Sequence, residues 1–182
     1  MALPTPILWA GTSEPLPGAS IYHFNMTLTD EDGKTLKLAD MRGQVVVIAL
    51  IYSHCTSACP LLRGDLKRLY QTMEPAQRSK VQFLLVTLDP SRDTSVRLKQ
   101  LEVNLGVDPA TWHLVRTSED DLRQIAAVLT VKYTQGEDGI INHTAVITLL
   151  DNEGVPRARI EGLSQPQENM LSQLKSLIPT SN

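Results

Sequence analysis

The two cysteines of this chain are four positions apart, in the segment Cys-Thr-Ser-Ala-Cys-Pro at residues 55–60. An unbroken apolar run at 45–52 precedes them, and residues 61–73 carry leucines at helical spacing. This order predicts a buried strand, then a turn holding Cys55, then a helix that begins near Cys59. The unpaired N–H groups of a helix N-terminus carry about half a positive charge and stabilise a thiolate. The segment therefore predicts a paired-thiol site for redox chemistry or for a soft metal ion.

The composition indicates one globular domain and excludes several functions. The 182 residues carry a net charge of −3 and contain no basic run that would line a nucleic-acid groove. Aromatic residues make up 4% of the chain, too few for a series of base-stacking platforms. The longest apolar run, 45–52, is too short to span a bilayer, and no secretion signal follows Met1. Because two cysteines do not make a disulfide framework, their pairing points to chemistry.

The order of predicted elements indicates an α/β fold. Residues 1–20 are rich in proline and glycine and are interpreted as a leader or linker, with one domain over 21–182. Segments 21–28 and 34–38 flank an Asp-Glu-Asp-Gly turn and predict a hairpin. Strands are predicted at 45–52, 81–88, 112–115, 144–150 and 155–160, and helices at 61–73, 94–105, 118–129 and 164–177. This alternation predicts a central mixed sheet flanked by helices.

The spacing of the cysteines bears on metal binding. Thioredoxin-type oxidoreductases have two residues between their cysteines, whereas this chain has three. The wider loop still permits a disulfide, and it also leaves room for an ion between the sulfurs. Two thiolates can hold Cu(I) in a linear arrangement, and an added imidazole makes the arrangement trigonal. A third ligand would have to come from elsewhere in the chain.

Four histidines are candidates for that ligand. His54 abuts Cys55, but adjacent side chains diverge at a strand end. His23 in the predicted hairpin and His113 beside a tryptophan are interpreted as surface or packing residues. His143 is predicted to begin the third core strand, and the sequence leaves open whether its imidazole reaches the thiols.

A second marked segment, residues 87–94 (Thr-Leu-Asp-Pro-Ser-Arg-Asp-Thr), follows a predicted strand at the same sheet end as the cysteines. Ordinary turn chemistry accounts for it: Asp-Pro starts a turn, and Asp93 or Thr94 caps the next helix. Arg92 is expected to pair with a carboxylate and brace the loop. We therefore predict a structural role for this segment.

Three motifs in this order resemble the Sco/SenC family. They are Cys-x-x-x-Cys-Pro after one strand, Asp-Pro-x-Arg-Asp-Thr after the next, and His-Thr entering a strand that ends in Asp-x-x-Gly. The resemblance spans residues 21–177 and implies a thioredoxin-like fold with an added N-terminal hairpin. It also implies a copper site formed by Cys55, Cys59 and His143. This site would bind Cu(I) and, through the imidazole, would also allow Cu(II). Family members assemble the binuclear copper centre of cytochrome c oxidase, which implies its copper-bearing subunit or another copper chaperone as the partner.

The chain departs from the family pattern near the implied site. Ser57 stands where the family usually has Asp, Thr56 where it commonly has Pro, and Asn142 where Asp usually precedes the histidine. Two fewer negative charges near the metal should weaken the preference for the more highly charged Cu(II).

Two further functions compete with that of a metallochaperone. One is a thiol–disulfide oxidoreductase that reduces a copper-accepting partner, with Cys55 attacking and Cys59 resolving. The other is a peroxidase, but the sequence shows no assignable set of residues that would activate a peroxidase thiolate. The resemblance also implies a periplasmic or other extracytoplasmic location, usually with an N-terminal membrane anchor, which this chain would have lost.

Overall fold

The structure is a computed structural model that describes residues 14–55 and 58–178. Most of the predicted leader, residues 1–13, and both Thr56 and Ser57 of the cysteine motif lie outside the described residues.

The centre of the fold is a five-stranded mixed sheet in the order β5 (Trp112–Val115), β4 (Val81–Thr87), β3 (Val45–Ile51), β8 (Val146–Leu150) and β9 (Pro156–Glu161). Strands β3, β4 and β5 are parallel, whereas β8 runs antiparallel to both β3 and β9. Every residue of β3 and β4 is buried, as their unbroken apolar runs predict for central strands. Because β3 and β4 are parallel, the segments that follow them emerge at the same sheet edge.

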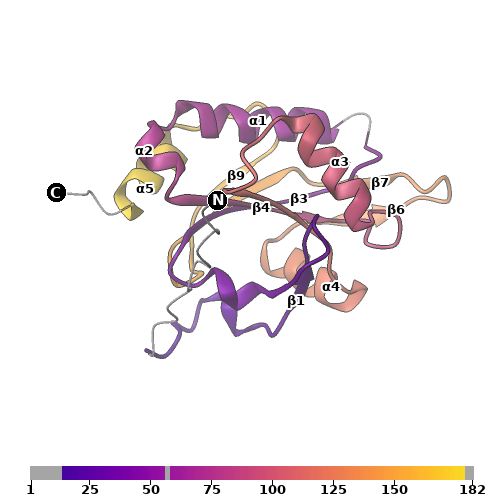
Figure 1. Ribbon diagram of the computed structural model, residues 1–182, viewed down its shortest axis with the longest axis horizontal. Helices are drawn as coiled ribbons and strands as arrows, with labels where there is room; N and C mark the ends of the chain where they lie inside the picture. The colour runs from indigo at the N-terminus through magenta and orange to yellow at the C-terminus, as the bar shows by residue number, and fades with distance from the viewer. Residues whose placement is uncertain (1–13, 56–57, 179–182) are drawn as a thin grey trace, which may run out of the picture.

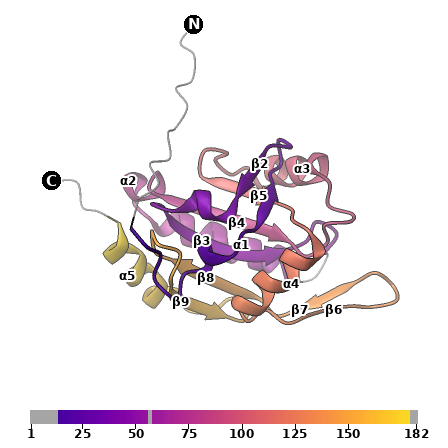
Figure 2. The same ribbon diagram turned by 90° about the horizontal axis from the view of Figure 1, so that it is seen from below.

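Helices cover both faces of this sheet (Figures 1 and 2). Helices α1 (Ala58–Thr72) and α5 (Glu168–Leu177) share one face, and α4 (Glu119–Val128) lies on the other with the N-terminal segment. Helix α3 (Ser95–Leu105) packs beside β5, and α2 (Pro75–Arg78) is a single turn after α1. Among the described helices, none has the length and apolar character needed to cross a membrane.

The helix boundaries follow local signals in the sequence. Thr94 caps α3 by accepting a hydrogen bond from the Arg97 N–H, and Gly106 ends that helix in the left-handed conformation. Ser118 caps α4 by accepting from the Asp121 N–H, 3.1 Å away. These caps confirm the predicted helix starts, with Thr94 and not Asp93 as the cap of α3.

The predicted N-terminal hairpin is present but shorter than expected. Its strands are β1 (Thr27–Thr29) and β2 (Thr35–Lys37), followed by a 3-10 turn, η2 (Leu38–Met41). The segment expected to begin the first strand instead forms another 3-10 turn, η1 (Ile21–His23). The Ser20 hydroxyl oxygen accepts from the Tyr22 N–H at 3.1 Å, a local bond that competes with strand pairing.

A hairpin that the prediction missed carries His143. Strands β6 (Tyr133–Gln135) and β7 (Ile141–His143) pair antiparallel and project from one end of the molecule (Figure 1). His143 is therefore the last residue of β7, and the prediction that it begins the core strand was wrong, since β8 starts only at Val146. The turn at 136–139 makes the hairpin possible, because Gly139 adopts φ 76° there.

Candidate metal centre

Cys55 lies at the mouth of α1, just after β3. Its sulfur accepts a hydrogen bond from the Cys59 N–H at 3.1 Å, one of the free N–H groups at the start of the helix. Such a donor stabilises negative charge on sulfur. The predicted placement of Cys55 in the strand-to-helix turn is therefore confirmed. No disulfide joins Cys55 to Cys59, and both thiols are buried, with 6% of Cys55 and none of Cys59 exposed.

The hairpin brings His143 to Cys59. The imidazole Nε2 lies 3.4 Å from Cys59 Sγ, although the two residues are 84 positions apart. The other ring nitrogen, Nδ1, lies 3.1 Å from the Thr144 carbonyl oxygen. Since a carbonyl can only accept, Nδ1 carries the proton and Nε2 presents its lone pair to the sulfur. This orientation is the one a metal-binding histidine requires.

Burial disfavours the charged form of both members of this contact. It raises the pKa of the Cys59 thiol to about 12, and the hydrogen bond with Cys55 adds to the shift. Burial also lowers the pKa of His143. The expectation that a helix N-terminus favours the thiolate therefore fails at Cys59. There the cost of removing the charged thiolate from water exceeds the stabilisation by the helix N–H groups. A metal ion binding here would have to displace the Cys59 proton.

Tyr52 also belongs to this site, and the sequence analysis did not single it out. Its ring meets the His143 ring edge-on, with centroids 6.0 Å apart. Burial raises the pKa of its hydroxyl to about 12, and a hydrogen bond with Cys55 contributes. The only available signal was its position at the end of the apolar run, three residues before Cys55.

The other three histidines contact groups other than the sulfurs. His54 is exposed, and its Nε2 accepts a hydrogen bond from Arg97, which occupies the lone pair a metal would need. His23 is exposed with its Nε2 2.9 Å from the Pro17 carbonyl oxygen, and His113 contacts Gln82 Oε1 at 2.8 Å. The interpretation of His23 and His113 as surface or packing residues agrees with these contacts.

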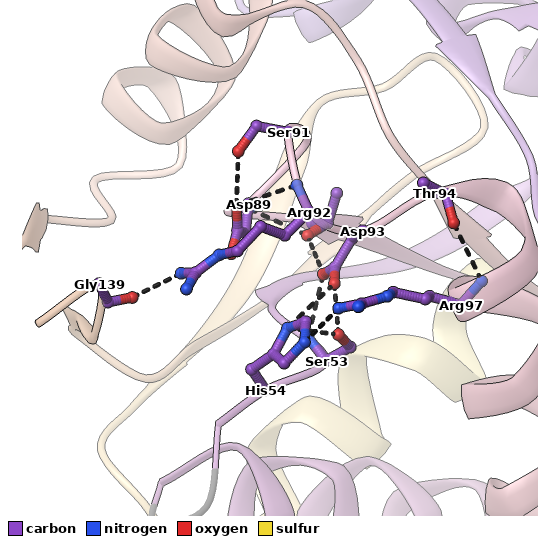
Figure 3. Close-up of polar contacts among 10 residues, drawn as sticks. Ser53, His54, Asp89, Ser91, Arg92, Asp93, Thr94, Arg97 and Gly139 are labelled. Atoms are coloured by element: carbon purple, nitrogen blue, oxygen red, sulfur yellow. Dashed lines mark hydrogen bonds and ion pairs between the residues drawn. The ribbon is translucent and has the colours of Figure 1, made fainter.

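The loop between β4 and α3 lies beside the cysteine turn (Figure 3). Asp93 is fully buried and accepts from the Ser53 N–H at 3.0 Å and from the Thr87 hydroxyl at 2.5 Å. Arg92 donates to the Asp89 carboxylate, as expected of a residue bracing the loop, and also to the Gly139 carbonyl oxygen. The predicted structural role of segment 87–94 is thus supported, and the loop contacts both segments that carry the candidate ligands.

The donor set is chemically suited to copper. Two sulfurs and one imidazole nitrogen are soft or borderline ligands, which suit Cu(I) and, through the imidazole, also Cu(II). Within the described residues, no group of three or more His, Cys, Asp or Glu side chains is already arranged to hold a metal ion. Cys59 and His143 are in contact, and Cys55 is joined to Cys59 through a backbone hydrogen bond. Closing this set around an ion thus requires side-chain movements.

A mixed sheet with a cysteine pair at the mouth of its first long helix defines a thioredoxin-like protein with a thiol site. The SCO1/SenC family model matches residues 16–179, so this chain belongs to that family. It is 24% identical over 155 residues to the SCO1 protein homolog of Bacillus subtilis, covering 82% of this chain and 79% of that protein. It is 28% identical over 152 residues to the bovine mitochondrial SCO2 homolog, covering 79% of this chain but only 55% of that longer protein.

Solved structures agree on the fold. A SCO1/SenC family lipoprotein from Bacillus anthracis superposes with a TM-score of 0.75 at 25% identity, covering 83% of this chain and 91% of the other. Arabidopsis thaliana ScoI with copper bound superposes with a TM-score of 0.72 at 18% identity, covering 82% of this chain and 96% of that chain. BsSco is described as a Sco family cytochrome c oxidase assembly protein with a disulfide switch. It superposes with a TM-score of 0.72 at 21% identity, covering 83% of this chain and 90% of that chain. The predicted family and the thioredoxin-like fold are confirmed.

Proposed function

We propose that this protein is a copper metallochaperone that binds its cargo through Cys55, Cys59 and His143. The observation that carries the proposal is the 3.4 Å contact between Cys59 Sγ and His143 Nε2, with the nitrogen lone pair facing the sulfur. An Nε2 lone pair with Nδ1 held by a carbonyl oxygen is what a metal-binding histidine offers to an ion. Copper bound to Arabidopsis ScoI, a relative in the same family, supports the choice of metal.

Assembly of the binuclear copper centre of cytochrome c oxidase is the role we propose for the bound copper. The description of BsSco as an oxidase assembly protein supports it. The expected partner is the copper-bearing oxidase subunit or another copper chaperone. The lipoprotein relative from Bacillus anthracis supports an extracytoplasmic location, which fractionation of cells expressing the protein would test.

An anaerobic Cu(I) titration of the reduced protein against a competing chelator tests the proposal. We expect one-to-one binding that weakens by about 100-fold or more in His143→Ala, because one of the three proposed copper ligands is lost. His113→Ala is the control, since that imidazole is also half-buried but contacts Gln82. Equal Cu(I) affinity in the parent and in His143→Ala would contradict the three-ligand site.

A thiol–disulfide oxidoreductase is the second candidate, favoured by the difference in burial between the two thiols. Cys55 would attack a partner disulfide and release one partner thiolate. Cys59 would then attack the mixed disulfide, which leaves Cys55 and Cys59 oxidised and the partner with two thiols. Copper and the disulfide compete for the same sulfurs, so we expect the oxidised protein to bind copper poorly. Undiminished binding after full oxidation would contradict this competition.

A further inference from the structure

We infer that the loop between β4 and α3 positions both arms of the copper site. Asp93 holds the cysteine arm, which is the chain from Ser53 to Cys55, and Arg92 holds the histidine arm, which is the β6–β7 hairpin that ends in His143. The inference rests on the copper-binding function proposed above and adds two positioning residues to it. Each acts through the backbone segment that carries a ligand.

Asp93 joins the ends of two parallel strands. Its carboxylate accepts from the Ser53 N–H and hydroxyl and from the hydroxyl of Thr87, the last residue of β4 (Figure 3). A fully buried carboxylate is costly unless several donors satisfy it, and two of these three bonds come from Ser53, which is thereby held in place. Ser53 precedes Cys55 by two residues. The direction in which the chain leaves β3 toward Cys55 is therefore set by Asp93.

Arg92 ties the histidine hairpin to the same loop. Its guanidinium donates to the buried carboxylate of Asp89 and, through another nitrogen, to the carbonyl oxygen of Gly139 in the β6–β7 turn (Figure 3). Strands β6 and β7 form a separate two-stranded sheet that projects from the fold (Figure 1). Because an isolated two-stranded hairpin is only marginally stable, a contact at its turn matters for where His143 lies.

The contacts of Asp93 with Ser53 and of Arg92 with Gly139 explain how one loop can position copper ligands from distant parts of the chain. The cysteines follow β3, and His143 ends β7, a strand of a separate sheet, so the loop adds a direct link between the two segments besides the pairing of β3 with β8. A site whose ligands are held in place before binding avoids part of the ordering cost. Outer-shell partners of metal ligands typically change metal affinity by about 10–100-fold.

The first test replaces Arg92 and a matched arginine. We expect Arg92→Gln to weaken Cu(I) binding by about 10-fold or more. Arg68→Gln is the control, because Arg68 also pairs with a buried Asp three residues earlier, Asp65, at comparable exposure. Asp65 contacts Ser164 and Gln167 instead of the hairpin, so Arg68→Gln should keep the parent's Cu(I) affinity. Equal losses in both variants would overturn the inference.

A double-mutant cycle shows whether Arg92 acts through His143. Added to His143→Ala, the Arg92→Gln change should weaken Cu(I) binding no further. The rate at which Cys55 and Cys59 form a disulfide should also match the parent in Arg92→Gln, since only the histidine arm is loosened. A full Arg92 effect in the His143→Ala background would overturn the assignment.

Gly139→Ala disturbs the contact while keeping Arg92. A Cβ at Gly139 would meet Arg92 Nη1 at 2.9 Å, and φ there is 76°. Gly33→Ala carries the same backbone strain, with φ 79°, but its Cβ would meet open space. We expect weaker Cu(I) binding only in Gly139→Ala. Unchanged affinity there would argue against a role for this contact.

Asp93 is tested by Ser53→Ala as well as by Asp93→Asn, since the latter could fail to fold. Ser53→Ala removes one donor and leaves the carboxylate in place. Both changes should weaken Cu(I) binding and speed the alkylation of Cys55 in the metal-free protein, whereas Asp65→Asn, at another buried carboxylate, should change neither. Parent-like values in Ser53→Ala would contradict the role of Asp93. If the parent itself bound Cu(I) weakly, the proposed function would fail; tight parent binding with unaffected Arg92→Gln would defeat only the present inference.

Discussion

The ring of Tyr52 meets the imidazole of His143 edge-on, with centroids 6.0 Å apart and ring planes at 74°. Tyr52 follows β3 directly, and His143 ends β7, so the contact joins the two segments that carry the candidate ligands. The Tyr52 hydroxyl also hydrogen-bonds Cys55. One side chain thus contacts both the cysteine arm and the histidine arm of the site.

This relationship predicts different effects for two substitutions of Tyr52. Tyr52→Phe keeps the ring edge against His143 and should change Cu(I) affinity by no more than about threefold. Tyr52→Leu removes the ring, lets the imidazole reorient, and should weaken binding by about tenfold. Competitive Cu(I) titration measures both. If Phe proved as damaging as Leu, the hydroxyl and not the ring would be what matters.

The two thiols should differ in reactivity. Alkylation requires a thiolate, and burial raises the pKa of Cys59 to about 12, so very little of it is ionised near neutral pH. Cys59 is also fully buried, whereas 6% of Cys55 is exposed. We expect iodoacetamide to modify Cys55 at least about tenfold faster, as measured by peptide mass spectrometry of the reduced, metal-free protein. Preferential modification of Cys59 would reverse the roles proposed for the oxidoreductase.

Placing an acidic residue beside the histidine should favour Cu(II). Asn142 is exposed on β7 and directly precedes His143. We expect Asn142→Asp to raise Cu(II) affinity by about tenfold and to change Cu(I) affinity less, because the added charge attracts the dication more strongly. Asn152→Asp is the control, since that exposed residue follows β8 at the opposite sheet edge. Equal gains for both ions would argue against a charge effect.

A pH dependence of stability should also arise outside the thiol site, at Glu31. This buried carboxylate accepts from the Leu114 N–H at 2.9 Å, and burial raises its pKa. A raised folded-state pKa means that the carboxyl stabilises the fold below its unfolded pKa, a contribution lost as pH rises through the folded pKa. Glu31→Gln cannot ionise and keeps an acceptor for Leu114.

Urea unfolding at several pH values measures this effect. The stability of the parent relative to Glu31→Gln should fall as pH rises from the ordinary pKa of a glutamate carboxyl through the raised pKa of Glu31. Glu168→Gln, at an exposed position in the first turn of α5, should show no such trend. A parent that gained stability over Glu31→Gln across this range would show that the sign is wrong.

Much of the framework was predictable because its signals are local. The buried runs of β3 and β4, the Thr94 and Ser118 caps, and the left-handed Gly106 each depend on residues within a few positions of one another. The placement of Cys55 at a helix mouth follows from the same kind of signal. So does the pairing of Arg92 with Asp89, three residues earlier.

The tertiary structure decided what depends on distant segments. Sequence periodicity did not distinguish the β6–β7 hairpin from a loop, so it could not show that His143 reaches Cys59. Nor could it show that Asp93 accepts from Ser53 and Thr87, because that requires two parallel strands to end at one edge. The raised pKa of Cys59 likewise follows from burial by the whole fold, which overrides the local effect of the helix N-terminus.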